Sequence, residues 1–375
     1  MIKQSANPLQ SAVAGLGLLA ISTLAAHALD TSSIVSVSGA YNARDVVTSQ
    51  NVSGGFSVVD GQVHTWLNDW NGYVGYQVGD IATGLVTTIG HPSFPINSNG
   101  YGDAFGLYDK STGSFYAGTY NDAGSGLYRY DTASGNWASL GVFNSLYGAA
   151  SHNGQVYASG LNAIWTGGVG QGNQIALYDL TGAGSHDVLI QATGNSAFVA
   201  LDNAGNIYYA NYNGGSPGLY KWSFDDINLV RADQGGGSSG GGEDDLYLRY
   251  EDAQLLTNLP GGANGIAVDD GGNVFVTVNG SSSALVMWNE SMGAWSEEDP
   301  FHFQQIAGSE GSFGWFGALD TQGDFLNGGS VYLSNYGSNG LAEITMAVPE
   351  PSTYALLIIS MGGLYLWRRN RNARA

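Results

Sequence analysis

A unit of about 50 residues recurs along this chain, and its copies share a turn that contains glycine. The turn glycines lie 52, 41, 51 and 67 residues apart, and they are Gly61, Gly113, Gly154, Gly205 and Gly272. Each copy consists of a small-apolar strand, the turn, a second strand with aromatic residues, and a third strand. One such small sheet cannot bury both of its faces, so it has to stack on its neighbours around an axis. The repeat therefore predicts an all-β fold, a β-propeller.

Six copies are visible in the sequence. Their first strands begin at Phe56, Ala104, Tyr147, Phe198, Gly265 and Phe316. Val, Ile and Tyr at alternating positions favour strands, and Asp-Gly, Asn-Gly and Gly-Asn pairs permit the positive φ of tight hairpin turns. Small residues suit inner strands, because these meet at the crowded centre of the ring. In the third and fifth copies the small residues are Gly148, Ala149, Ala150, Gly265 and Ala267.

The sixth copy lacks an outermost strand, and an unassigned apolar segment precedes the first copy. That segment is Ile34-Val35-Ser36-Val37, and we expect it to pair with the sixth copy and close the ring. Six blades are therefore predicted. Residues 41–52 fit neither a strand of these copies nor a loop clearly, and they leave a seventh blade open as an alternative.

Composition agrees with a compact β domain. Glycine is abundant at 58 of 375 residues and proline is scarce at 8, which suits many short strands joined by tight turns. Aromatic residues make up 12% of the chain, so the composition is not that of a disordered protein. The chain has no cysteine, which excludes disulfides, thiolate zinc sites and a thiol nucleophile.

The charge is strongly acidic. All 31 acidic residues lie between Asp30 and Glu350, and only six of the 11 basic residues lie in that span, so its net charge is near −25. This field repels nucleic acid and anionic polymers, and we expect no nucleic-acid partner. An acidic surface is compatible with the binding of divalent cations, neutral glycans or basic partners.

Residues 1–28 have the pattern of a secretory signal peptide. Lys3 gives a basic start, residues 12–26 form an uncharged and largely apolar run, and Ala26-His27-Ala28 fits the small-x-small cleavage pattern. Cleavage after Ala28 predicts a mature chain that starts at Leu29. The alternative is a retained N-terminal anchor, for which the apolar run is short.

The last 28 residues, 348–375, combine three features in a fixed order. Pro349, Glu350 and Pro351 come first, an uncharged apolar run covers residues 354–367, and a basic tail begins with Arg368 and Arg369. As a helix the run spans about 21 Å, short of the ~30 Å hydrocarbon core of a bilayer. A buried helix is the alternative, but a basic cluster directly after an apolar end acts as a stop signal.

This tail resembles the PEP-CTERM sorting signal of Gram-negative bacteria. The resemblance implies recognition by an exosortase, a membrane-embedded cysteine protease-transpeptidase, with cleavage at or near Pro349-Glu350-Pro351. It also implies transient anchoring in the inner membrane through residues 354–367, and then delivery to the cell surface or the extracellular matrix. Such proteins usually belong to bacteria that make exopolysaccharide, so exopolysaccharide or another surface glycan is an expected partner.

Residues 264–276, within the fifth copy, resemble NHL-type and sugar-lactonase (regucalcin-like) propellers. In the lactonase family, acidic and amide side chains hold a central metal, and one of them is a glutamate early in the chain. In this sequence the first glutamate is Glu243. The resemblance thus implies the propeller fold and, as an alternative function, a Ca²⁺-dependent lactonase or hydrolase.

Aspartates in three turns are the candidate metal ligands. They are Asp202, Asp269 and Asp320, whose carboxylates are of the type that binds Ca²⁺. The competing interpretation is that these side chains cap the backbone of their own hairpin turns. The sequence implies no other cofactor, and the five histidines that remain after export show no metal-binding spacing.

The densest aromatic stretch provides the candidate glycan site. It contains Trp66, Trp70, Tyr73 and Tyr76, which would stack on sugar rings if exposed. Aromatic residues packed between blades give the same pattern, so both interpretations stay open. The tract at residues 235–245, rich in Gly and Ser and ending in acidic residues, predicts a flexible loop between the fourth and fifth copies.

The leading hypothesis is an exported, exosortase-sorted propeller without catalytic activity, with a structural, adhesive or glycan-binding role. The alternatives are the Ca²⁺-dependent propeller hydrolase and a periplasmic platform for protein interactions.

Overall fold

The computed structural model describes residues 32–363, except for a set of gaps. The gaps are residues 38, 53–54, 70–71, 94–102, 120–124, 144–145, 162–172, 183–184, 193–197, 212–216, 234–246, 260, 280–282, 291–302, 310–315, 336–338 and 348–359. The predicted signal peptide, Pro349-Glu350-Pro351, Arg368, Arg369 and the Gly/Ser tract therefore lie outside the described residues.

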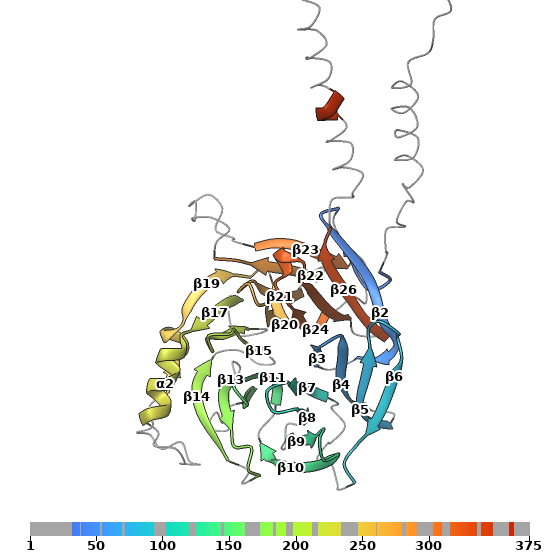
Figure 1. Ribbon diagram of the computed structural model, residues 1–375. Helices are drawn as coiled ribbons and strands as arrows, with labels where there is room; N and C mark the ends of the chain where they lie inside the picture. Colours follow the sequence, from blue (N-terminus) through green and yellow to red (C-terminus); the bar gives the residue numbers. More distant parts are fainter. Residues whose placement is uncertain are drawn as a thin grey trace, which may run out of the picture. The chain divides into compact units, whose positions relative to one another are not determined.

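Six sheets, each with four antiparallel strands, stand around a central axis, so the prediction of a six-bladed β-propeller is confirmed (Figure 1). Blade 1 contains β3 (Phe56–Val59), β4 (Gln62–Asp69), β5 (Gly72–Asp80) and β6 (Val86–Gly90). Blade 2 contains β7 (Asp103–Asp109), β8 (Ser114–Thr119), β9 (Ser125–Asp131) and β10 (Asn136–Phe143). Blade 3 contains β11 (Leu146–His152), β12 (Gln155–Leu161), β13 (Asn173–Tyr178) and β14 (His186–Ala192).

The other three blades follow the same order from the axis outwards. Blade 4 contains β15 (Phe198–Leu201), β16 (Ile207–Ala210), β17 (Gly218–Trp222) and β19 (Gln254–Asn258). Blade 5 contains β20 (Gly262–Val268), β21 (Val274–Asn279), β22 (Ser283–Trp288) and β23 (Phe303–Ser309). Blade 6 contains β24 (Phe316–Gln322), β25 (Ser330–Asn335), β26 (Asn339–Met346) and β2 (Tyr41–Asn51).

An N-terminal strand closes the ring as expected, but the prediction that residues 34–37 form this strand was wrong. The closing strand is β2, which pairs antiparallel with β26 from Tyr41 opposite Met346 to Val46 opposite Leu341. Only Ser36 and Val37 of the apolar segment form a strand, β1, and it pairs with β23 of blade 5. Ile34 and Val35 are buried in the core instead of forming a sheet edge. Residues 41–51 are thus the missing strand of blade 6, and they do not form a seventh blade.

Additional elements cover the outer edges of two blades. Besides β1 on blade 5, the short strand β18 (Leu248–Arg249) adds to β14 of blade 3 in parallel. It belongs to an insertion between β17 and β19 that also contains helix α2 (Phe224–Asp233) and the 3₁₀ turn η1 (Tyr250–Asp252). Ile227 and Val230 of α2 are fully buried in the cluster formed by blades 3 and 4.

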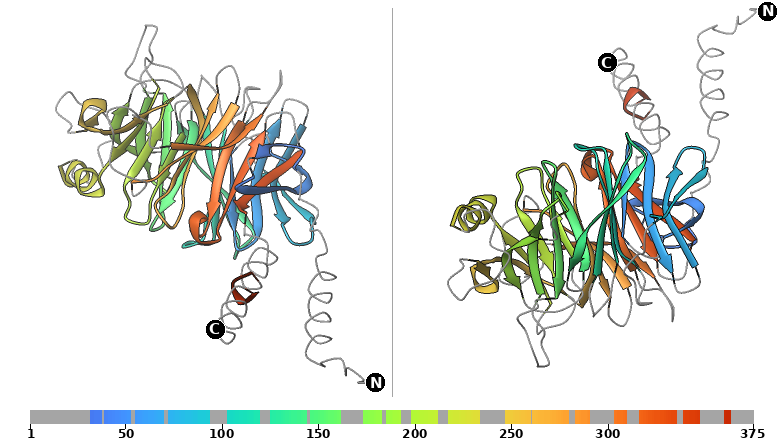
Figure 2. Two further views of the ribbon diagram at one scale, coloured as in Figure 1. Left: turned by 90° about the horizontal axis from the view of Figure 1, so that it is seen from above. Right: turned by 90° about the horizontal axis from the view of Figure 1, so that it is seen from below.

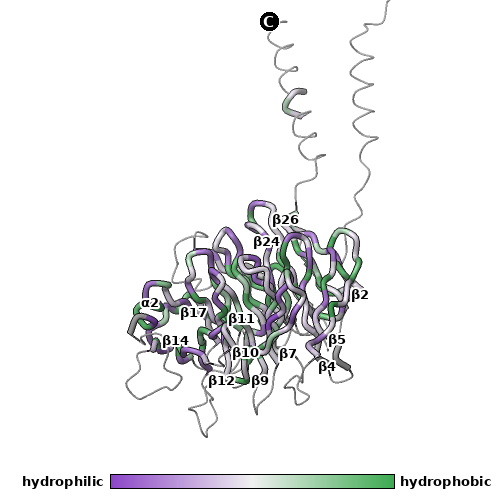
Figure 3. Tube along the Cα trace, turned by 60° about the horizontal axis from the view of Figure 1, so that its bottom comes forward, coloured by the Kyte–Doolittle hydropathy of each residue, from purple (hydrophilic) through white to green (hydrophobic). Residues whose placement is uncertain are grey.

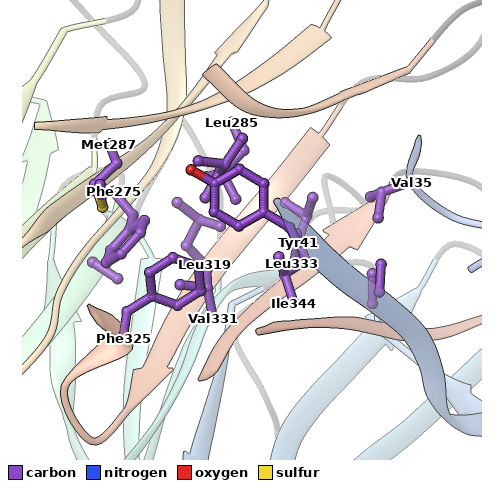
Figure 4. Close-up of a cluster of buried hydrophobic side chains, with 14 of the residues drawn as sticks. Val35, Tyr41, Phe275, Leu285, Met287, Leu319, Phe325, Val331, Leu333 and Ile344 are labelled. Carbon is purple, nitrogen blue, oxygen red and sulfur yellow. The ribbon is translucent and has the colours of Figure 1, made fainter. Parts of the chain in front are cut away.

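The central strands of the blades are buried because a neighbouring blade covers each of their faces. Every residue of β8, β16 and β21 is buried. Figure 3 shows hydrophobic stretches along the strands and hydrophilic residues at many of the turns. Each Å² of apolar surface removed from water stabilises the fold by about 25 cal/mol, which compensates for the absence of disulfides. Figure 4 shows one such cluster, in which Tyr41 of β2 packs among residues of blades 5 and 6.

The tight turns form where glycine pairs predict them. Asp60 and Gly61 have φ of 50° and 76°, and Asn153 and Gly154 have φ of 50° and 75°. Positive φ at both central residues is the geometry of the two-residue hairpin turns that Asp-Gly and Asn-Gly favour.

An ion pair between an exposed arginine and a buried glutamate fastens the closing strand. Arg44 of β2 contacts Glu343 of β26 through its Nη2, which lies 2.5 Å from Oε2. The other carboxylate oxygen of Glu343 accepts hydrogen bonds from Ser330 and Tyr332 of β25. At the start of the domain, Asp45 accepts hydrogen bonds from Ser32 and Ser33, and these bonds hold the N-terminal segment against β2.

Contacts divide the chain into two compact units, residues Thr31–Met346 and a second unit of Met1–Asp30 with Ala347–Ala375. The propeller is the first of them, and Figure 2 shows its blades from two further sides. In the second unit, residues 360–363 form an exposed turn of helix. Among the residues that the structure describes, no helix is long and apolar enough to cross a membrane.

Candidate functional site

The candidate site is the channel along the propeller axis. The innermost strands β3, β7, β11, β15, β20 and β24 surround a cavity of about 240 Å³. Its walls consist of residues 55–59, 105–108, 149–151, 198–201, 266–268 and 318–320. Small-molecule ligands bind in such concave places, and pockets for drug-sized ligands measure about 300–1,000 Å³. The channel therefore suits a ligand that is smaller than a typical drug molecule.

Glycines set the width of the channel, because they let neighbouring inner strands approach closely. A Cβ on Gly265 of β20 would lie 2.5 Å from the carbonyl oxygen of Gly317 in β24. A Cβ on Gly148 of β11 would lie 2.6 Å from the ring of Phe198 in β15. Both distances are shorter than van der Waals contact, so the predicted role of these small residues at the crowded centre is confirmed.

The innermost strands of the six blades can be aligned with one another through their pairing with the second strand of each blade. In every blade the second strand carries an aromatic or imidazole side chain at the equivalent position. These residues are His64, Tyr116, Tyr157, Tyr208, Phe275 and Tyr332. Opposite these rings the inner strands carry Ser57, Leu107, Ala150, Ala200, Ala267 and Asp320, respectively. All six line the channel, and we call this set the Asp320 level. Five blades place a small or apolar side chain there, and blade 6 alone places a carboxyl.

The carboxyl of Asp320 joins the last blade to the first. Its Oδ2 accepts a hydrogen bond of 2.5 Å from the backbone N–H of Val58 in β3, and its Oδ1 accepts one of 2.8 Å from Thr321. Burial raises the pKa of Asp320 to about 7, although the two backbone N–H groups act in the opposite direction. The side chain is half-buried at the channel wall. It can therefore exist in either protonation state near neutral pH.

The other two candidate metal ligands are engaged in their own turns. Asp202 accepts hydrogen bonds from Ala204, Asn206 and Tyr208. Asp269 accepts hydrogen bonds from Gly271, Asn273 and, across to blade 6, the N–H of Phe325. Neither residue is part of the channel wall. Both side chains thus do what the competing interpretation of the sequence proposed, capping the backbone of tight turns.

A calcium ion in the channel would need six to eight oxygen ligands. The described wall offers one carboxyl, and both of its oxygens already accept hydrogen bonds from the backbone. Among the described residues, no group of three or more His, Asp or Glu is gathered to hold a metal. These residues do not fit a propeller calcium site.

Two of the four candidate glycan-stacking residues lie in the core. Trp66 is 1% exposed and Tyr76 is 2% exposed, and they pair across strands β4 and β5. Tyr76 stacks on Phe115 of blade 2 with 4.0 Å between ring centres. A ring enclosed between blades has no face open to a sugar, so stacking by Trp66 and Tyr76 does not hold in this structure. Trp70 and the side chain of Tyr73 lie outside the described residues.

A half-buried tyrosine is a wall residue that the sequence did not single out. Tyr108 of β7 lines the channel and stacks on the buried His64 of blade 1 with 4.1 Å between ring centres. Burial lowers the pKa of His64 to about 4, so this imidazole is neutral at physiological pH. The N–H of Tyr108 donates to the hydroxyl of Ser57, which joins blade 2 to blade 1. No local motif marks these residues, because the channel forms only when six separate strands meet.

No family model matches the sequence. No curated protein sequence matches it either. Among solved structures, the PQQ-bound aldose sugar dehydrogenase from Streptomyces coelicolor is similar with a TM-score of 0.52 and 14% identity, covering 83% of this chain and 99% of that one. A regucalcin from Agrobacterium tumefaciens, described as a calcium-binding protein, gives a TM-score of 0.50 at 14% identity and covers 80% of this chain and 92% of its own. TolB from Acinetobacter baumannii gives 0.46 at 13% identity, over 77% of this chain and 65% of TolB. The likeness to the dehydrogenase and the regucalcin establishes the propeller fold.

Proposed function

We propose that the protein is an exported β-propeller that binds or scaffolds and does not catalyse, and that its C-terminal tail sorts it to the cell surface or the extracellular matrix. The observation that carries the proposal is the chemistry of the channel. Its described wall has Asp320 as its one carboxyl, and that group is committed to the backbone of two blades. Hydrolytic sites normally pair an acid with a base, or hold a metal that activates water.

The sequences of the two termini support export and sorting to the cell surface. The small-x-small sequence before Leu29 fits export, and the Pro349-Glu350-Pro351 triplet, the apolar run and the arginines fit an exosortase substrate. A sorting signal has meaning only for a chain that has been exported, so the two features support each other. The partners in this proposal are an exosortase and a neutral surface glycan, because the net charge near −25 disfavours nucleic acid and acidic polymers.

Intact mass and cell fractionation test the proposal directly. The protein is isolated from its host with and without the exosortase. We expect a mature species that runs from about Leu29 to the Pro-Glu-Pro region, found outside the inner membrane only when the enzyme is present. A species that retains Arg368 and Arg369 in both strains would mean that the tail is an ordinary anchor, and the surface role would lose its support.

One observation favours a second candidate, a propeller hydrolase or lactonase. Asp320 lies on the wall of a channel, and its pKa of about 7 is that of an effective general acid or base. A panel of lactones and glycosides, assayed with Ca²⁺ and with a chelator, separates the two candidates. Turnover that disappears in Asp320→Asn would establish the hydrolase and refute the non-catalytic proposal.

A further inference from the structure

Asp320 is the exception in an otherwise regular ring. At the Asp320 level the other five blades carry Ser57, Leu107, Ala150, Ala200 and Ala267. A carboxyl in such a wall costs more desolvation free energy than an alanine or a serine does. Its presence therefore needs a reason beyond packing.

The hydrogen bond to the next blade is not that reason. Ser57 of blade 1 accepts the N–H of Tyr108 in blade 2, as Asp320 of blade 6 accepts the N–H of Val58 in blade 1. Val58 and Tyr108 occupy the same position, each one residue beyond the Asp320 level in its own strand. A neutral hydroxyl thus makes the same connection in the same geometry, so the carboxyl of Asp320 supplies something more.

What it adds is a single ionisable carboxyl group in the channel wall. A carboxylate has about four lone-pair sites, and the bonds from Val58 and Thr321 use two of them. The rest of the described wall consists of apolar groups, glycines, two serines and the half-buried Tyr108, and it contains no second carboxyl and no basic side chain. A single carboxylate in a cavity without basic side chains attracts a single opposite charge.

We propose that Asp320 anchors a binding site in the axial channel for a small organic monocation of the alkylammonium type. Its N–H groups would donate to the free lone pairs of the carboxylate, in the strong charge-assisted form of the hydrogen bond. The small side chains of Ala150, Ala200 and Ala267 on the wall leave room for a short alkyl group, and the aromatic ring of Tyr108 on the wall attracts cations. A divalent metal is the poorer fit, because one carboxylate leaves most of its coordination positions empty. The net charge near −25 raises the concentration of cations around the protein.

The test is calorimetric titration of the full-length chain with n-butylammonium at pH 8.5, where Asp320 is ionised. The matched neutral probe is 1-butanol, which has the same alkyl chain. Asp320→Ser removes the charge. Its hydroxyl should still accept the hydrogen bond from Val58, as the hydroxyl of Ser57 accepts one from Tyr108. We therefore expect this variant to fold, and thermal denaturation checks that it does. Asp60→Asn removes one exposed charge that is not among the residues of the channel wall, and it controls for general attraction of cations to an acidic surface.

We expect saturable one-site binding of n-butylammonium to the wild-type chain and to Asp60→Asn. Asp320→Ser should weaken it at least tenfold, and 1-butanol should not bind. Equal binding by wild type and Asp320→Ser, or no saturable binding at all, would overturn the proposal. Tighter binding of Ca²⁺ or glucose than of n-butylammonium, lost in Asp320→Ser, would also overturn it and assign the carboxyl to a metal or sugar site. The result is independent of whether the tail is processed, so it does not depend on the sorting proposal.

Discussion

The pH dependence of stability offers a quantitative test of how Asp320 is held. In the unfolded chain its carboxyl has an ordinary pKa of 3.8, and in the fold burial raises that pKa to about 7. Between these values the folded state binds a proton that the unfolded state has released. The free energy of unfolding therefore falls as the pH rises from about 4 to about 7, and the loss is complete above pH 7.

The magnitude follows from the size of the shift. About three pKa units correspond to about 4 kcal/mol, at about 1.4 kcal/mol per unit. Because Asp320 is half-buried and keeps contact with the open channel, we expect about 2 kcal/mol of this to be observed. The interval from pH 5 to pH 8 covers about two of the three pKa units, so Asp320→Ser should gain about 1.3 kcal/mol of stability over the wild type across it.

Urea denaturation of both proteins at pH 5, 6, 7 and 8 measures the difference. Other carboxylates and the histidines titrate in both proteins, so their contributions cancel when the two free energies of unfolding are subtracted. Ser57→Ala, which removes the neutral counterpart of the same bond, should change stability by an amount that does not depend on pH. A difference between Asp320→Ser and wild type that stays constant from pH 5 to pH 8 would refute the reasoning.

Three further outcomes are expected. Gly265→Ala places a methyl group 2.5 Å from the carbonyl of Gly317 and should cost about 1–3 kcal/mol in chemical denaturation; a neutral result would show that the inner strands can separate freely. Trp66→Ala should cost about 3–5 kcal/mol without changing retention on immobilised neutral glycan, and a loss of retention at unchanged stability would contradict its burial. A chain shortened after Met346 should keep the circular dichroism and melting temperature of the full chain, whereas one that also lacks residues 29–51 should not fold, because blade 6 loses β2.

Local patterns were enough to predict the blades. Asp60-Gly61 and Asn153-Gly154 predict hairpins because their left-handed backbone is a property of two residues and does not depend on distant contacts. The closing strand could not be recognised in the same way. Arg44 and Asp45 make residues 41–51 look like a solvated loop, and the partner that compensates Arg44 is Glu343, 299 residues away.

The candidate site could be predicted less well from the sequence than the blades could. Asp202, Asp269 and Asp320 are each followed three residues later by glycine, so they look equivalent in the sequence. The carboxylates of Asp202 and Asp269 cap turns that begin directly after these residues. In the third, strand β24 continues to Gln322 before turning through η2 (Phe325–Asn327), and this leaves Asp320 inside the ring. Only the pairing of the strands shows the difference.

The place of β26 has a mechanical consequence. This strand is flanked on one side by β25 and on the other by β2, and it ends at Met346, opposite Tyr41. A pull on Met346 along the strand loads the hydrogen bonds of both ladders together, in shear, and does not open them one after another. The C-terminal end of the propeller is therefore a mechanically resistant point of attachment, and tension applied there should be carried into two neighbouring strands before blade 6 yields.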